Sequence, residues 1–279
     1  MYNYADDNTL SYHHTDVAAM SSALENDAQN TVKWFTENEM QANPDKFQGI
    51  TFGKTSTLIQ SFQIQDAQIE CSETVKLLGI TFDKQLKFQK HVDNICENAS
   101  RQINMLLRLS RRLEAPSKRV IYDSFITANF SYCPLVWMMC GKVNSDKIEN
   151  LQYRALKFVY NEYDATYSEL MEMAGVNSLL IGRMRRLAIE VFKCVHKISP
   201  NYVCEMFEIH NVNYDFRDPF PLQQRSYKTI THGRRTFSYM GSKLWNDLPN
   251  DIKCITSLEE FRSMMKKWDG DCPCRDWYL

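Results

Sequence analysis

The chain has 279 residues, of which 44% are hydrophobic and 24% charged, and its formal net charge is −1. This is the composition of an ordinary globular protein, long enough for one sizeable core or two modest domains. No apolar stretch approaches the ~20 residues that a membrane-spanning helix needs, and no secretory signal pattern opens the chain. We therefore expect a cytoplasmic or nuclear protein that is not secreted and has no membrane partner.

The first part of the chain predicts a small mixed sheet with one packed helix. Aromatic and β-branched residues on both sides of Asp6-Asp7-Asn8 favour a β-hairpin. Apolar residues at three- and four-residue steps predict a helix over residues 17–35, with Asp16 as its N-cap and Pro44 ending it. Further strands are predicted at residues 47–53, 62–64 and 75–82.

Beyond residue 83 the apolar pattern becomes helical. Amphipathic helices are predicted at residues 88–106, 116–130, 145–163 and 178–198, followed by an irregular segment over 199–256. Ser257 and Glu260 stand three residues apart, as in a capping box, and begin a last helix. The predicted fold class is α+β, with a sheet-containing part at 1–85 and helical parts at 86–135 and 136–279.

Charge is unevenly distributed along the chain. Residues 1–80 carry 4 Lys/Arg against 11 Asp/Glu, whereas residues 81–279 carry 29 against 23. Such asymmetry suggests a nucleic-acid partner for the basic half, and a solvated helix face is the alternative. The strongest candidates for phosphate contacts are Arg101, Arg108, Arg111, Arg112, Lys118 and Arg119. Further candidates are Arg183, Arg185, Arg186, Arg225, Lys228, Arg234 and Arg235.

Two adjacent carboxylates, Asp6 and Asp7, are a candidate magnesium site. Mg²⁺ prefers oxygen ligands and is commonly held by one or two protein carboxylates together with substrate phosphates. A tight turn lets neighbouring side chains reach one volume, whereas on a straight strand they point to opposite faces. Without further context, a simple polar turn is the better explanation of the same residues, because Asp and Asn are common in turns.

The sequence around these aspartates resembles the catalytic hairpin of reverse transcriptases, which carries Tyr-Ala-Asp-Asp. "NPDKFQGITFG" and "VKLLGITFD" resemble the two motifs that follow it, and "CPLVW" and "GSKLWNDLP" resemble the C-terminal part of LINE-type (non-LTR) retrotransposon reverse transcriptases. The resemblance implies a partial polymerase palm at 1–85, thumb-like helices at 86–135 and a helical C-terminal region at 136–279.

The resemblance also implies roles for individual residues. Asp6 would be the stronger Mg²⁺ ligand and Asp7 a more peripheral one, while Lys46 would lie near the phosphates of the incoming nucleotide. Leu77, Leu78 and Gly79 would belong to the hairpin that holds the primer terminus. The implied partners are an RNA template, a DNA primer or RNA–DNA duplex, and deoxynucleoside triphosphates.

The resemblance further implies parts that the sequence lacks, namely a third carboxylate from an upstream strand and a fingers region. We therefore expect a fragment of an RNA-directed DNA polymerase that is inactive as an isolated chain, because a two-metal site needs close placement of all its ligands. The alternatives are a non-enzymatic nucleic-acid-binding module that uses the basic helices, and the product of a decayed element without function.

Other candidate sites carry weaker patterns. Cys272 and Cys274, with His232 and Cys254 upstream, lack the second close ligand pair of a typical zinc site, so zinc is not expected. The nine cysteines show no disulfide framework, and we expect them to be reduced. His13 and His14 are expected at a strand end rather than on a metal.

Overall fold

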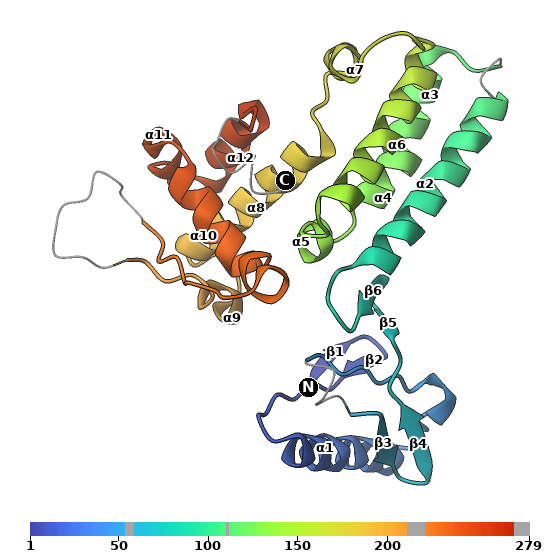
Figure 1. Cartoon of the computed structure of the whole chain (residues 1–279), viewed down its shortest axis with the longest axis vertical. Coiled ribbons are helices and arrows are strands. Elements are labelled where there is room, and N and C mark those ends of the chain that lie inside the picture. Colours follow the sequence, from blue (N-terminus) through green and yellow to red (C-terminus); the bar gives the residue numbers. More distant parts are fainter. Residues whose placement is uncertain (54–58, 110–111, 211–220, 271–279) are drawn as a thin grey trace. The chain divides into compact units, whose positions relative to one another are not determined.

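The computed structural model describes residues 1–53, 59–109, 112–210 and 221–270, and it divides into two compact units, Met1–Leu86 and Lys87–Leu279 (Figure 1). The first unit combines strands with one long helix, and the named elements of the second unit are all helices. The α+β class is thus confirmed. The division of the second unit into thumb-like and C-terminal regions stays a prediction.

The strands of the first unit form three separate antiparallel hairpins. They are β1 (Tyr2–Tyr4) with β2 (Asp7–Thr9), β3 (Ser61–Ile64) with β4 (Ala67–Glu70), and β5 (Thr74–Leu77) with β6 (Ile80–Asp83). The predicted single mixed sheet is therefore wrong for the described residues. The segment predicted as a strand over 47–53 contributes only one parallel bridge, between Gly49 and Cys71.

Helix α1 (Val17–Glu37) packs against β3 in the first unit (Figure 1). The predicted N-cap is confirmed, since Asp16 Oδ1 accepts hydrogen bonds from the backbone N–H of Ala18 (2.9 Å) and Ala19 (3.4 Å). The helix ends well before Pro44, which instead opens the short 3₁₀ turn η1 (Pro44–Lys46). On the sheet side, Glu25 Oε1 accepts from the backbone N–H of Gln63 at 2.8 Å and so joins α1 to β3.

The first half of the second unit is built around α2 (Gln89–Leu109) and α6 (Lys142–Tyr160), which pack side by side. The apolar stripe predicted between Phe88 and Leu106 is buried at each of its positions. A further helical segment packs against α2 and α6. It consists of α3 (Ala115–Ile121), the π-helical turn η4 (Tyr122–Ile126) and α4 (Thr127–Ser131). Two short helices complete this half, α5 (Pro134–Trp137) and α7 (Tyr167–Ala174).

Helix α8 (Leu179–Val195) is the centre of the second half, and α10 (Phe237–Asp247) and α12 (Leu258–Lys267) pack against it. Phe192 of α8 stacks on Phe261 of α12 with ring centroids 4.3 Å apart. The remaining elements are α9 (Asn201–Cys204), the π-helical turn η5 (Ile230–Arg234) and α11 (Asn250–Lys253).

The prediction of an irregular segment over 199–256 is wrong because α10 lies within it. Gly241 explains the difference. A Cβ atom at this position would lie 2.7 Å from the Phe207 ring and 2.9 Å from Val191, so the glycine permits close packing of α10 on α8. Glycine has low intrinsic helix propensity, and the packing overrides it.

The predicted capping box does not form at the last helix, since Ser257 makes no side-chain hydrogen bond as N-cap of α12. A capping box does form at α7. There the Thr166 hydroxyl accepts from the backbone N–H of Glu169 (3.4 Å), and the Glu169 carboxylate accepts from the backbone N–H of Thr166 (2.7 Å). The same Ser/Thr-x-x-Glu pattern thus gives two different local structures.

Candidate active site and nucleic-acid interface

Asp6 and Asp7 lie at the turn of the β1–β2 hairpin. The strand register pairs Tyr4 with Asp7, so Ala5 and Asp6 form the two-residue turn and Asp7 begins β2. Ala5 has a left-handed φ of 51°, and Asn8 Nδ2 donates to the backbone carbonyl of Asp6 at 3.2 Å. Both aspartates are exposed, and so are the flanking Tyr2 and Tyr4.

Two adjacent, exposed carboxylates can supply part of a magnesium coordination shell, because Mg²⁺ usually keeps several water ligands. No group of three or more His, Cys, Asp or Glu side chains that could hold a metal occurs among the described residues. Within that part of the chain, the hairpin therefore offers a pair of protein ligands. His14 makes a different contact, near the start of α1: its Nδ1 accepts a hydrogen bond from the backbone N–H of Asp16 at 3.0 Å.

Lys46 is the last residue of η1 and is exposed. The turn is fixed by Asn43, whose side-chain oxygen accepts from the backbone N–H of Asp45 at 3.0 Å. No hydrogen bond or ion pair within the described residues joins Lys46 to Asp6 or Asp7. The structure thus leaves Lys46 in the same unit as the two aspartates without direct contact to them.

Leu77, Leu78 and Gly79 lie at the β5–β6 hairpin. Leu77 pairs with Ile80, so Leu78 and Gly79 form the turn, and both have left-handed φ values of 45° and 83°. Turns with two positive φ values suit the twist of β-hairpins, and they normally prefer Asn or Gly at the first position. An exposed leucine in this conformation is uncommon, and its role at a primer terminus stays a prediction.

Three of the predicted phosphate contacts are exposed and free of acidic partners. Arg101 and Arg108 lie on α2, seven residues apart and hence on one face of the helix, and Arg112 follows shortly after it. No ion pair of the described residues involves any of the three, and Arg101 donates to the side-chain oxygen of Asn98 on the same helix. Arg111 lies outside the described residues.

The structure corrects the prediction for Lys118, which is only 1% exposed. Its ammonium donates to Asn161 Oδ1 at 2.9 Å and lies 4.9 Å from the centroid of the Phe158 ring. A lysine held in the core by these contacts is not placed to bind a phosphate. Arg119 is partly buried. It forms an ion pair with Asp123 (2.7 Å) and donates hydrogen bonds to the Tyr160 hydroxyl (3.1 Å) and to the backbone carbonyl of Ala174.

The three arginines of α8, predicted as further phosphate contacts, all make contacts within the second unit, and Arg186 is exposed. Arg183 is 3% exposed and donates to Ser145 Oγ at 2.7 Å. Arg185 donates to the backbone carbonyl of Trp268, and Arg186 donates to that of Ser131 at 2.6 Å. These side chains join α8 to neighbouring segments, which the residue types alone do not reveal.

The other basic candidates lie late in the chain. Arg225 forms an ion pair with Glu208, while Lys228, Arg234 and Arg235 are exposed. The Arg235 guanidinium packs over Gly141, where an added Cβ would lie 3.3 Å from its Nη1 atom. Of the weak zinc candidates, His232 and Cys254 are exposed, and Cys272 and Cys274 lie outside the described residues.

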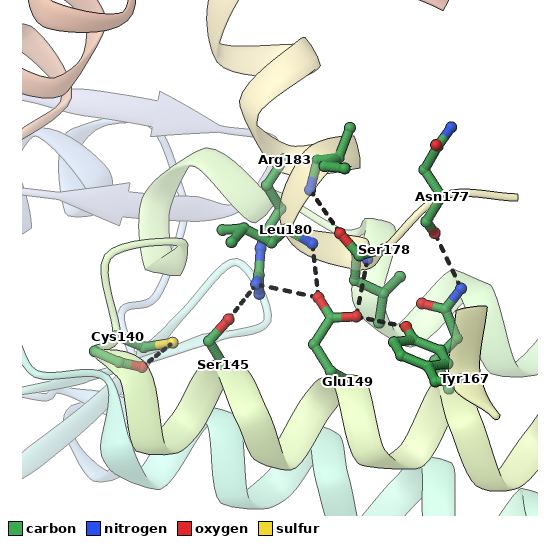
Figure 2. A network of polar contacts seen from close by, with 12 residues as sticks. Cys140, Ser145, Glu149, Tyr167, Asn177, Ser178, Leu180 and Arg183 are labelled. Carbon is green, nitrogen blue, oxygen red and sulfur yellow. Dashed lines mark hydrogen bonds and ion pairs between the residues drawn. The ribbon is translucent and has the colours of Figure 1, made fainter. Parts of the chain in front are cut away.

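Sequence reasoning missed a polar network centred on Glu149 of α6 (Figure 2). Its carboxylate accepts hydrogen bonds from the backbone N–H groups of Leu179 (3.1 Å) and Leu180 (2.8 Å), and from the Tyr167 hydroxyl (2.6 Å). Burial and the adjacent carboxylate raise the pKa of Tyr167 above its usual range. The carboxylate of one helix thus caps the N-terminus of another, a contact without any local sequence signal.

Comparison with curated proteins gives distant matches to RNA-directed DNA polymerases of mobile elements. The chain is 25% identical over 158 residues to the RNA-directed DNA polymerase from mobile element jockey of Drosophila melanogaster. It is 24% identical over 161 residues to the probable RNA-directed DNA polymerase from transposon BS of the same species. The jockey polymerase of Drosophila funebris is 22% identical over 157 residues. The chain is a distant relative of these polymerases.

The alignments cover 55% and 56% of this chain but only 17% and 18% of the two Drosophila melanogaster proteins. The chain thus spans less than a fifth of the length of the curated relatives it matches. No protein-family model matches the chain, and neither does a solved structure. No helix of the described residues is long and apolar enough to cross a membrane.

Proposed function

We propose that this chain is part of the RNA-directed DNA polymerase of a non-LTR retrotransposon, with the β1–β2 hairpin as its portion of the catalytic centre. The observation that carries the proposal is the position of Asp6 and Asp7 on an exposed hairpin turn, in a chain distantly related to such polymerases. In this role the two carboxylates bind Mg²⁺, which neutralises phosphate charge during nucleotidyl transfer.

The other predicted site residues fit supporting roles. Lys46, exposed at the end of η1, supplies a positive charge for the phosphates of a deoxynucleoside triphosphate. In the β5–β6 turn, Leu78 has a left-handed backbone conformation that is unusual for leucine. Unusual backbone conformations of this kind occur often at functional sites. In our proposal this turn contacts the primer terminus.

Metal binding at the hairpin is the direct test. We expect Mn²⁺, used as a paramagnetic probe in place of Mg²⁺, to broaden the NMR signals of residues 4–9 with an affinity on the order of 1 mM. Asp6→Asn should remove this broadening. The chain offers a matched control in Asp66, which occupies the same second turn position in the β3–β4 hairpin. Broadening that persists in Asp6→Asn, or that needs Asp66, would contradict the proposal.

Catalysis is tested separately by primer extension on an RNA template with Mg²⁺. The described residues hold no third metal ligand near the pair, and we therefore expect no incorporation by the isolated chain. Incorporation that is lost in Asp6→Asn would show that the chain is an active polymerase and that the expected inactivity is wrong.

A second candidate function is nucleic-acid binding without catalysis. It is favoured by the exposure of Arg101, Arg108 and Arg112, which form no ion pair within the described residues and lie in the C-terminal half of α2 and just beyond it. One helical turn advances about 5.4 Å, so Arg101 and Arg108 are about 10 Å apart along the helix and can contact separate phosphates. Such binding is independent of sequence and weakens with salt.

The test of this function is a fluorescence-anisotropy titration of an RNA–DNA duplex at several salt concentrations. Reversing Arg101, Arg108 and Arg112 to Glu should abolish binding at physiological salt, and each lost contact should reduce the salt slope by about 0.9. Arg262→Glu, an exposed arginine on α12, serves as the matched control. Equal loss in the control, or unchanged affinity in the triple variant, would argue against this interface.

A further inference from the structure

The N-terminus of α6 belongs to neither candidate site, and it has no side chain that caps it. Its N-cap is Gly141, with backbone angles of φ 87° and ψ 162°. This region of backbone conformation is open to glycine and closed to almost every other residue. The usual capping residues Ser, Thr, Asp and Asn are therefore excluded here, and the first N–H groups of α6 need an acceptor from elsewhere.

This end of the helix is open to solvent. Lys142 and Val143, the first two residues of α6, are exposed, and Val143 is 73% exposed. N–H groups at these positions have no acceptor within a helix, and together with the positive end of the helix dipole they attract anions. The first turn contains no acidic residue that could balance the dipole from within.

Arg235 brings a guanidinium to the same place from the segment before α10. An added Cβ at Gly141 would lie 3.3 Å from Arg235 Nη1 and 3.5 Å from its Nη2, so the guanidinium lies directly beside the N-cap. Arg235 is exposed, and none of the ion pairs of the described residues involves it. A cation beside the positive end of a helix dipole is unfavourable unless an anion binds to both.

Arg183 lies against the same turn from the core. This side chain is only 3% exposed, and its Nη2 donates to Ser145 Oγ at 2.7 Å (Figure 2). The Ser145 N–H donates to the Gly141 carbonyl at 3.0 Å, which ties this contact to the N-cap. Nε and Nη1 of Arg183 have no hydrogen-bond partner among the described residues. Glu149 is 4.0 Å away and accepts shorter hydrogen bonds from other groups, so it balances the charge of Arg183 only in part.

We propose that the N-terminal turn of α6 and the Arg235 guanidinium form a binding site for a phosphate group. The N–H groups of Lys142 and Val143 and the Arg235 side chain donate to separate phosphate oxygens, and arginine commonly makes bidentate contacts of this kind. Arg183 stays in the core and contributes through its positive charge. The required chemistry is a tetrahedral oxyanion, whose source is either free phosphate or the backbone of a nucleic acid.

The aspartates of the β1–β2 hairpin and the arginines of α2 take no part in this site, so the inference does not depend on either proposed function. Reversing Arg101, Arg108 and Arg112 to Glu should weaken binding of an RNA–DNA duplex and leave the affinity for inorganic phosphate unchanged. The two sites can therefore fail separately.

Titration of the full chain with sodium phosphate at constant ionic strength tests the proposal. We expect the backbone amide NMR signals of Lys142 and Val143 to shift, with a dissociation constant on the order of 1 mM, whereas chloride at the same ionic strength should not shift them. Arg235→Ala should weaken phosphate binding by about tenfold. Arg154→Ala, which removes an exposed arginine further along α6, is the matched control and should stay within about twofold of the wild type.

An RNA–DNA duplex identifies the source of the phosphate. A duplex that shifts the same two signals in the wild type but not in Arg235→Ala assigns the site to nucleic-acid phosphates, and a duplex that leaves them unshifted assigns it to free phosphate. Circular dichroism establishes that each variant is folded. The proposal is overturned if inorganic phosphate shifts neither signal, if Arg235→Ala binds it as tightly as the wild type, or if Arg154→Ala loses as much affinity as Arg235→Ala.

Discussion

Arg183 and Glu149 form an ion pair of 4.0 Å between α8 and α6, with Arg183 only 3% exposed. The distance is at the long end for an ion pair, and two guanidinium nitrogens of Arg183, Nε and Nη1, have no hydrogen-bond partner among the described residues. Ser145 and the Trp137 ring are the other neighbours of this guanidinium. The arginine thus depends on Glu149 to neutralise its charge in the core.

Removing Glu149 should therefore destabilise the second unit strongly. Glu149→Ala leaves Arg183 buried without its carboxylate and leaves the N–H groups of Leu179 and Leu180 without an acceptor, so we expect a loss of about 3 kcal/mol or more. Unfolding in urea measures this loss as a change in the free energy of unfolding. Glu172→Ala, at an exposed site, should change stability by less than about 0.5 kcal/mol. A loss no larger in Glu149→Ala than in this control would contradict the role of the pair.

The two Ser/Thr-x-x-Glu segments predict unequal effects of the same substitution. Thr166→Ala removes a hydroxyl that accepts from the backbone of Glu169, and it should cost about 1 kcal/mol. Ser257→Ala removes a hydroxyl that makes no capping bond, and its cost should be within about 0.5 kcal/mol. Thermal unfolding of the two variants side by side checks this, and equal costs would mean that the Ser257 cap forms in solution.

Substitutions of Lys118 and Arg108 should distinguish a role in packing from a role in nucleic-acid binding. Lys118→Met keeps the length of a buried side chain and removes no exposed charge, so the affinity for an RNA–DNA duplex should stay within about twofold. Arg108→Glu reverses an exposed charge and should weaken binding by about tenfold. Anisotropy titration at fixed salt measures both. A comparable loss in Lys118→Met would place that lysine on the binding surface after all.

Stability should fall on mild acidification because two histidines are held neutral. Burial lowers the pKa of His91 and of His196 below the ordinary value of 6.5. Below pH 6.5 the unfolded chain binds protons at these sites while the folded chain does not, so their contribution is fully present above pH 6.5 and decreases as the pH falls. Urea midpoints at pH 7.5 and 5.5 measure the decrease, and His91→Gln should reduce it. An equal decrease in wild type and variant would exclude His91 as a cause.

Helix positions were well predicted where one face of a helix determines burial. The stripe on α2 that includes Val92, Ala99 and Ile103 is fully buried, because its residues recur with the helical period. The Asp16 cap was equally predictable, since it depends on contacts within three residues. The turn around Asp6 was located from residue types, although β2 begins at Asp7, within the segment Asp6-Asp7-Asn8 that was expected to form the turn.

Sequence reasoning failed where tertiary contacts override residue type. The turn at Gln65-Asp66 contains no glycine or proline, and the β3–β4 hairpin was therefore missed as a hairpin. Arginine usually indicates a surface, but its long side chain can cross to a neighbouring segment, as Arg185 does to reach the carbonyl of Trp268. Neither contact leaves a pattern in the local sequence.

The wide turn η4 has a consequence for the history of the chain. Tyr122, Ile126 and Phe130 are all buried, and the first two of them lie in this turn. A π-helical turn accommodates one more residue than an α-helical turn, so a single-codon insertion within a once regular helix is its simplest origin. Relatives without that codon should be one residue shorter between Tyr122 and Ile126.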